Sequence, residues 1–173
     1  RGGKTVTRYN NPVTDTAIKK FGSSSLQLDG NEDYIGLTSN NDFGFGTGDY
    51  TVEGWFYFNS VAATQYLFDF RAGASTDVAP VVYINAGGEL RFYSYNADRI
   101  TGATLSTGQW YHIAVSRSGT STKLYIDGTS QGTWTAATDY GIAKPLIVGA
   151  DWNSTNFFNG NIDEFRVTKG VAR

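Results

Sequence analysis

Apolar and polar residues alternate along most of this chain, and a period of two predicts β-strands rather than helices. The clearest case is GQWYHIAVSRSGTSTKLYIDG, residues 108–128, in which a polar stretch typical of a turn separates two alternating runs. The segment ends in Asp127-Gly128, a pair that tolerates the positive φ angles of a tight hairpin turn. We therefore expect a third strand, residues 129–135, to fold straight back on the second.

Short apolar runs recur about every eight to twelve residues, and helix signals are nearly absent. In TVEGWFYF, residues 51–58, both faces carry aromatic side chains, so we place this strand in the middle of a sheet. The chain has 21 glycines, 15% aromatic residues and only three prolines, a composition typical of an all-β sandwich or barrel. Besides residues 129–135, strands are expected at residues 25–29, 34–38, 50–59, 65–71, 81–85, 89–95, 110–117, 123–126, 145–148 and 160–168.

The length and charge of the chain narrow the function classes. Its 173 residues are enough for one domain, residues 1–173, in which the polar residues 1–20 form an edge strand or an arm. The net charge of −2 and the scattered basic residues give no reason to expect a nucleic-acid or membrane partner. No apolar run approaches the roughly 20 residues of a membrane-spanning helix. The absence of cysteine excludes disulfides and thiolate sites, and the absence of methionine points to a processed product or a piece of a longer protein.

Three polar residues in LDGNEDY have a spacing found in calcium loops. Asp29, Asn31 and Asp33 occupy alternate positions, which lets oxygen atoms converge on a hard cation. An EF-hand is excluded, because Tyr34 stands where that loop needs glycine and Asn40 where it needs glutamate. In the alternative interpretation, the three residues cap a turn through hydrogen bonds between side chain and backbone. The sequence leaves calcium binding and turn capping open.

Candidate catalytic residues are few. Asp163 and Glu164 are adjacent, and adjacent residues of a regular strand point to opposite faces, so they do not make a catalytic carboxylate pair. The chain has no Glu-x-Asp-x-Glu run and no Gly-x-Ser-x-Gly elbow. The only histidine, His112, lies inside an expected strand, where packing is a more common role than catalysis. We predict that the chain is not an enzyme.

Aromatic residues in the later loops are mixed with Asn and Asp. A sugar presents both C–H patches and hydroxyl groups, so ring faces beside amides and carboxylates suit it. The candidate ligand-binding residues are Trp134, Asp151, Trp152 and Phe157. Alternatively, part of this group covers one end of the sandwich. Placement in a loop favours a binding role for Trp152.

Three ordered runs, LQLDGNEDYIGLTSNNDFGFGTGDYTVEGWFYF, GQWYHIAVSRSGTSTKLYIDG and FNGNIDEFRV, span residues 25–167. Their order and spacing resemble the laminin-G-like branch of the concanavalin A-like lectin/glucanase superfamily. The resemblance implies an all-β jelly-roll sandwich of two antiparallel sheets. It also implies a structural calcium, with Asp29 and Asp163 as ligands and Asn31 or Asp33 as helpers. The carboxylate run of the superfamily's glucanases is missing, so the resemblance implies binding rather than hydrolysis.

The ending IDEFRVTKGVAR resembles the version of this domain found in structural proteins of tailed phages and environmental viruses. This resemblance implies a non-catalytic, lectin-like module on a virion surface or an extracellular protein, with a glycan or host-surface polysaccharide as partner. Loops at one end of the sandwich or the concave sheet would recognise the glycan. The alternative is a structural capsid or tail decoration domain, or an oligomerisation domain, that contacts other virion proteins and no sugar.

Overall fold

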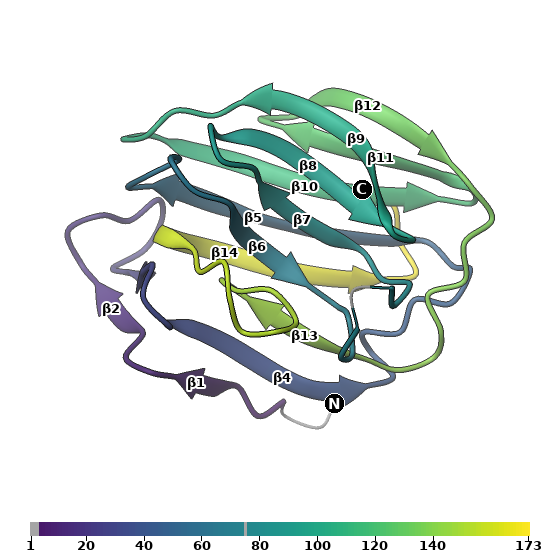
Figure 1. Ribbon diagram of the computed structural model, residues 1–173, viewed down its shortest axis with the longest axis horizontal. Helices are drawn as coiled ribbons and strands as arrows, with labels where there is room; N and C mark the ends of the chain where they lie inside the picture. The colour runs from purple at the N-terminus through teal and green to yellow at the C-terminus, as the bar shows by residue number, and fades with distance from the viewer. Residues whose placement is uncertain (1–3, 75) are drawn as a thin grey trace.

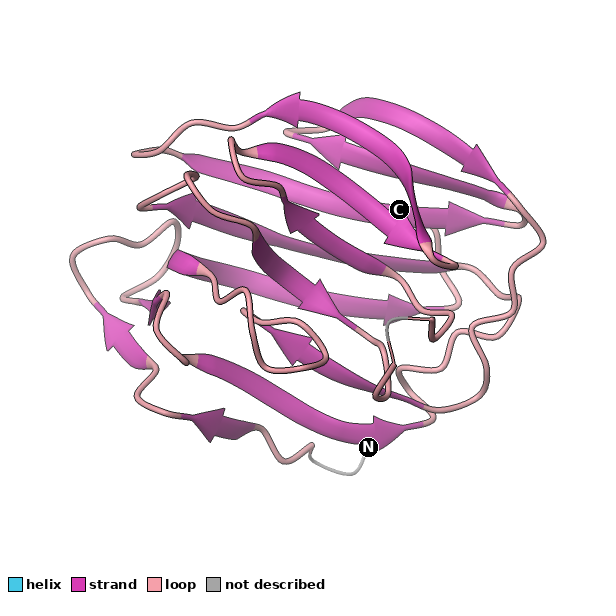
Figure 2. Cartoon of the chain, viewed as in Figure 1, coloured by secondary structure: helices cyan, strands magenta, loops and turns pink. Residues whose placement is uncertain are grey.

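Two seven-stranded antiparallel sheets pack face to face, and Figure 1 and Figure 2 show them as stacked layers. The computed structural model describes residues 4–74 and 76–173, and this part of the chain contains strands but no helix. The expected all-β sandwich class is therefore confirmed. It also follows that the described residues include no helix long and apolar enough for a membrane span.

The chain crosses repeatedly between the two sheets. Sheet A runs, in spatial order, through β1 (Thr7–Tyr9), β4 (Tyr34–Asn40), β13 (Lys144–Val148), β6 (Gln65–Asp69), β7 (Val81–Ile84), β8 (Glu89–Ser94) and β9 (Ala97–Thr104). Sheet B runs through β12 (Thr129–Thr135), β11 (Ser121–Ile126), β10 (Trp110–Ser118), β5 (Tyr50–Phe58), β14 (Asn159–Lys169), β3 (Ser25–Asp29) and β2 (Val13–Asp15). The connections from β1 to β2, from β3 to β4 and from β13 to β14 each pass from one sheet to the other.

The predicted three-stranded meander is confirmed as β10, β11 and β12. Asp127 and Gly128 have φ angles of 49° and 77°, so both turn residues adopt the left-handed conformation. The Asp127 carboxylate accepts the backbone N–H of His112 at 2.8 Å, which ties the turn to β10. The strand expected to be central is β5, and it lies between β10 and β14 in sheet B.

The core between the sheets is rich in aromatic rings. Phe56 and Phe58 of β5 are fully buried and contact Phe158 edge-on, with ring centroids 5.9 and 5.2 Å apart. Gly54, on the same face of β5, leaves room for Phe165, because a Cβ at Gly54 would lie 3.2 Å from the Phe165 side chain. The opposite face of β5 therefore points out of the sandwich.

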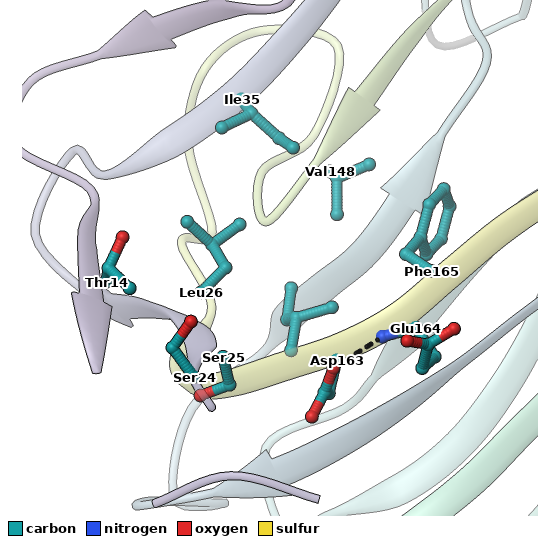
Figure 3. A pocket seen from close by; sticks show the side chains of 10 residues that line it. Thr14, Ser24, Ser25, Leu26, Ile35, Val148, Asp163, Glu164 and Phe165 are labelled. Atoms are coloured by element: carbon teal, nitrogen blue, oxygen red, sulfur yellow. Dashed lines mark hydrogen bonds between the residues drawn. The ribbon is translucent and has the colours of Figure 1, made fainter. Parts of the chain in front are cut away.

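A β-bulge interrupts β14. Its pairing with β5 shifts register between Asp163 and Arg166, and Glu164 has a φ of 48°. The Asp163 carboxylate accepts the backbone N–H of Glu164 at 2.9 Å. Both residues line a pocket of about 350 Å³ that also contacts β2 and β3 of sheet B and β4 and β13 of sheet A (Figure 3). The assumption of regular alternation for these two acids is therefore wrong, because the bulge inserts an extra residue at this point.

Strands at the sheet edges are those that alternation reveals least. The alternation of apolar and polar residues does not predict β9, the edge strand of sheet A that pairs with β8. Its sequence ADRITGAT contributes only Ile100 to the core. Within the polar N-terminal segment, β1 is an edge strand of sheet A and β2 an edge strand of sheet B. Residues 1–3 of that segment lie outside the described residues. Edge strands are defined by backbone pairing rather than by an apolar pattern, because much of their surface is solvated.

Candidate functional site

Three of the connections between the sheets meet beside β4 and form a pocket of about 360 Å³. They are the loop after β1, the turn between β3 and β4, and the loop of residues 151–157 between β13 and β14. We call this pocket the three-ring pocket, because three of its lining side chains are aromatic. The lining residues are Tyr9, Asn10, Glu32, Tyr34, Ser154 and Phe157.

The three rings stack in a row. The ring centroids of Tyr9 and Tyr34 lie 4.2 Å apart with an interplanar angle of 7°, and those of Tyr34 and Phe157 lie 6.2 Å apart at 25°. Tyr9 is the register partner of Tyr34 across β1 and β4, and 42% of its surface is exposed. Gly36 makes space for this arrangement, since a Cβ there would lie 3.0 Å from Tyr9 Cε2. The row presents a partly exposed apolar surface.

Polar groups surround the rings. The Tyr34 hydroxyl lies 2.9 Å from Ser154 Oγ, so the two hydroxyls form a hydrogen bond across the pocket. Asn10 and Glu32 are exposed at its rim, and Asn10 Nδ2 donates to the carbonyl of Asn31 at 2.8 Å. The pocket therefore combines ring faces with hydroxyl, amide and carboxylate groups.

Asp33 fixes the turn between β3 and β4. Its side chain is buried, with Oδ1 accepting the backbone N–H of Asn11 at 2.8 Å and Oδ2 accepting that of Asp29 at 3.4 Å. Asp29 Oδ1 in turn accepts the backbone N–H of Asn31 at 2.8 Å. These bonds hold the N-terminal segment against the turn and so position Tyr9 and Asn10.

The loop of residues 151–157 is held from inside and at both ends. Inside it, the buried Asp151 carboxylate accepts hydrogen bonds from the backbone N–H and hydroxyl of Thr155 at 2.8 and 2.7 Å. At one end, the backbone N–H of Trp152 donates to Asp69 Oδ2 at 3.0 Å. Just beyond the other end, Asn159 N–H donates to Gln65 Oε1 at 2.8 Å. The loop therefore presents Phe157 from a preformed scaffold.

Asp69, the anchor of this loop, is fully buried and paired with Arg71. Arg71 Nη2 lies 2.5 Å from Asp69 Oδ2, and Arg71 Nε lies 3.0 Å from Oδ1. Burial raises the pKa of the Asp69 carboxyl, although the Arg71 guanidinium acts in the opposite direction. The loop thus depends on an ion pair beneath it.

Backbone strain is concentrated around the three-ring pocket. Asn10, Glu32, Ser154 and Asn156 have φ angles of 57°, 65°, 55° and 52°, values that L-residues other than glycine rarely adopt. They lie in the three loops that form the pocket. Strained residues persist where the surroundings fix them, and they gather at ligand sites.

The predicted metal ligands fall into two separate places. Asp29, Asn31 and Asp33 share the turn described above, where Asp29 and Asp33 accept backbone N–H groups. Asp29 pairs with Asn159, so Asp163 lies about 13 Å farther along β14. There its carboxylate accepts the backbone N–H groups of residues 20 and 21, each at 2.9 Å.

One ion does not fit both places. Within residues 4–74 and 76–173, no three His, Cys, Asp or Glu side chains are grouped as metal ligands. Calcium requires six to eight oxygen ligands, so an ion at either place would depend mainly on backbone or water oxygens. Calcium binding stays a prediction of the sequence.

Three of the four predicted ligand-binding residues lie on one loop. Phe157 lines the three-ring pocket, Asp151 stabilises the loop from inside, and Trp152 is half-buried at its start. Trp134 lies elsewhere. Its ring packs 6.1 Å from that of Phe92 and lines a separate pocket of about 540 Å³.

Of the residues that line the three-ring pocket, sequence reasoning found only Phe157 and missed Tyr9, Asn10, Glu32, Tyr34 and Ser154. Alternation assigns Tyr34 to a strand and treats the N-terminal segment only as a polar edge. Gly36 carried a usable signal, because glycine inside a strand marks the close approach of another group.

Comparisons with known proteins agree with this architecture. The family described as the concanavalin A-like lectin/glucanases superfamily matches residues 29–172. No match was found among curated proteins.

Several solved structures are similar over most of the chain. Domain 4 of AbnA, a GH43 extracellular arabinanase from Geobacillus stearothermophilus, in complex with arabinotriose, has a TM-score of 0.77 and 23% identity, over 99% of this chain and 84% of that one. The carbohydrate binding module CBM66 from Bacillus subtilis has a TM-score of 0.55 and 13% identity, over 95% of both chains. Domains LG4-5 of the mouse laminin alpha1 chain have a TM-score of 0.64 and 22% identity, over 83% of this chain and 40% of that one. At these identities the likeness concerns the fold.

Proposed function

We propose that this chain, which belongs to the concanavalin A-like lectin/glucanases superfamily, is a non-catalytic module that binds a glycan in the three-ring pocket. The observation that carries the proposal is the row of Tyr9, Tyr34 and Phe157 rings beside exposed polar groups. Sugars present C–H patches to ring faces and hydroxyls to hydrogen-bonding groups, and this pocket supplies both.

Each lining group has a role in the proposal. Phe157 and Tyr9 supply ring surface for the C–H side of a sugar. The Glu32 carboxylate and the Asn10 side chain accept or donate at the rim, and the hydroxyl pair of Tyr34 and Ser154 exchanges its mutual bond for bonds to a sugar hydroxyl. Because the loops are already held by internal hydrogen bonds, little order is lost on binding.

The comparisons support a carbohydrate ligand. The arabinanase domain is in complex with arabinotriose, and the Bacillus subtilis protein is a carbohydrate binding module. Both are similar in fold, so the ligand class comes to this chain as part of the proposal. The missing Glu-x-Asp-x-Glu run supports binding without hydrolysis.

A glycan array followed by calorimetric titration tests the proposal. Phe157→Ala is expected to weaken binding of the selected glycan about tenfold. Tyr95→Ala is the matched control, because Tyr95 is also an exposed aromatic residue but lines the separate Trp134 pocket. Loss of binding in the control alone would place the glycan at Trp134 and contradict the proposal.

The setting we propose is a virion surface or an extracellular protein, on the strength of the sequence ending IDEFRVTKGVAR. The rival function is a structural decoration or oligomerisation domain whose partners are other virion proteins. If no glycan on the array binds and light scattering shows self-association, the rival function would be favoured.

A further inference from the structure

A second pocket lies on the outer face of sheet B, away from the three-ring pocket. It has a volume of about 320 Å³, within the range of ligand sites. It is lined by Phe21, Glu53, Trp55, His112, Glu164 and Arg166, and we call it the Trp55 pocket. None of these residues belongs to the site described above.

The two pockets lie on opposite sides of the sandwich. In β4, Ile35 and Leu37 pack against the core, so Tyr34 points out of sheet A. In β5, Phe56 and Phe58 are buried, so Trp55 points out of sheet B. A ligand in one pocket therefore does not exclude a ligand in the other.

Register places the side chains of the Trp55 pocket side by side. Trp55 of β5 is the Cα partner of His112 in β10 and of Asp163 in β14. Glu53 is the partner of Arg166, one step along β14 beyond the bulge. The pocket thus stands on three neighbouring central strands, which form a rigid base.

The β-bulge adds Glu164 to this group. In a regular strand Glu164 would point away from the face that carries Asp163, but its φ of 48° turns it so that it lines the Trp55 pocket. The left-handed conformation is unfavourable for glutamate. Strained backbone clusters at ligand sites, and here it places the Glu164 carboxylate in the lining of the pocket.

The pocket is polar and carries side chains of both charge signs. Glu53 Oε1 accepts hydrogen bonds from Arg166 Nε and Nη2 at 3.0 and 2.7 Å, and Glu53 Oε2 lies 3.3 Å from His112 Nε2. The ammonium of Lys20 lies 4.0 Å from the Trp55 ring centroid. Glu53 and Glu164 thus lie among the basic side chains of Arg166, His112 and Lys20. Because the pocket carries groups of both signs, it favours a neutral ligand.

Aromatic rings extend the surface beyond the pocket. Trp55 contacts Phe21 edge-on, with ring centroids 5.7 Å apart. The next outward-facing pair along β5 and β10 is Tyr57 and Trp110, whose ring centroids lie 5.6 Å apart. The two ring groups are about 7 Å apart along β5. Such a row suits consecutive rings of an extended chain.

We propose that the outer face of sheet B is a second carbohydrate-binding surface, and that it takes a segment of a neutral, unbranched polysaccharide. One sugar ring stacks on Trp55 and hydrogen-bonds to the Glu53, Arg166 and Glu164 side chains, while the next contacts Tyr57 and Trp110. Lys20 gives up a weak surface contact with the Trp55 ring. The surface shares its ligand class with the proposed function but none of its residues, so the module binds two chains at once.

Titration of the whole chain with neutral arabinan, xylan, mixed-linkage glucan and galactomannan tests this proposal. For a polysaccharide that binds, Trp55→Ala is expected to lower the affinity of one class of sites about tenfold. Phe157→Ala removes only the three-ring pocket. If binding survives Phe157→Ala but not Trp55→Ala, the function proposed for the three-ring pocket fails and the second surface stands.

Glu164→Gly separates binding from folding. Glycine adopts a positive φ without strain, so this variant is expected to melt at a temperature a few degrees higher and still bind more weakly at the Trp55 pocket. A folding defect does not produce that combination. Unchanged affinity in both Trp55→Ala and Glu164→Gly, with cooperative melting of each, would overturn the proposal.

Discussion

The rings of Tyr9 and Tyr34 face each other across β1 and β4, with centroids 4.2 Å apart. Strand β1 is only three residues long and lies at the edge of sheet A. Tyr9 is nevertheless positioned before any ligand arrives, because the stack and the hydrogen bond from Asn11 to Asp33 hold the segment. Preorganisation of this kind lowers the entropy lost on binding.

Gly36→Ala should therefore weaken glycan binding without unfolding the domain. The new Cβ would lie 3.0 Å from Tyr9 Cε2, so the ring of Tyr9 has to shift by a few tenths of an ångström from its place against Tyr34. We expect an affinity loss of about threefold in calorimetric titration, the size of one aromatic contact. Thr38→Ala, an exposed change in the same strand, is the control and should leave the affinity unchanged. Equal affinities in the two variants would contradict a role for the Tyr9 ring.

Asp15 makes stability depend on pH. Its pKa is lowered from 3.8, first by the Ala17 N–H and then by the Asn161 amide, which donates to Oδ2 at 2.9 Å. Since folding favours the ionised form, Asp15 stabilises the fold above pH 3.8, and this contribution is lost as the pH falls through the lowered pKa. Urea unfolding between pH 2 and 7 should show a shallower acid-side decline in Asp15→Asn than in the unmodified chain. Asp139→Asn controls for the change in charge, and the same shallow decline there would refute the assignment.

How far the sequence predicts this molecule depends on how much of each strand is buried. Strand β5 is buried on one face over its full length, so its alternation predicts its existence, and the aromatic residues on both of its faces predict its central place. Strand β9 contributes one buried residue, Ile100, and pairs through its backbone, so no pattern marks it. The turn at Asp127 is local chemistry and is predicted to the residue.

The candidate site is harder to predict because distant segments build it. Phe157 is recognisable as a loop aromatic, but Tyr9 and Tyr34 join it only through the pairing of β1 with β4 and the packing of the loop of residues 151–157. The Trp55 pocket depends on a register shift in β14 that places Glu164 beside Trp55. A local pattern of residues predicts neither which strands pair nor where a β-bulge lies.

Binding of a structural calcium ion is a separate prediction, and thermal melting tests it. The resemblance predicts that a chelator lowers the melting temperature and that calcium restores it, since an ion bound only to the folded chain stabilises it. Because Asp29 and Asp163 are about 13 Å apart along the sheet, they cannot share one ion. The calcium-dependent shift should therefore disappear in only one of Asp29→Asn and Asp163→Asn. A melting curve that chelator leaves unchanged would exclude a structural ion.

Arg71→Met should destabilise the fold through the buried ion pair. It leaves the Asp69 carboxylate, which has no exposed surface, without its guanidinium partner, at an expected cost of about 3 kcal/mol in urea unfolding. Because Asp69 also accepts the Trp152 N–H, amide hydrogen exchange should accelerate in residues 151–157. Arg166→Met is the control, since its pair with Glu53 is partly exposed and contributes at most about 1 kcal/mol. Equal losses in the two variants, or unchanged exchange in the loop, would show that the Asp69–Arg71 pair does not support it.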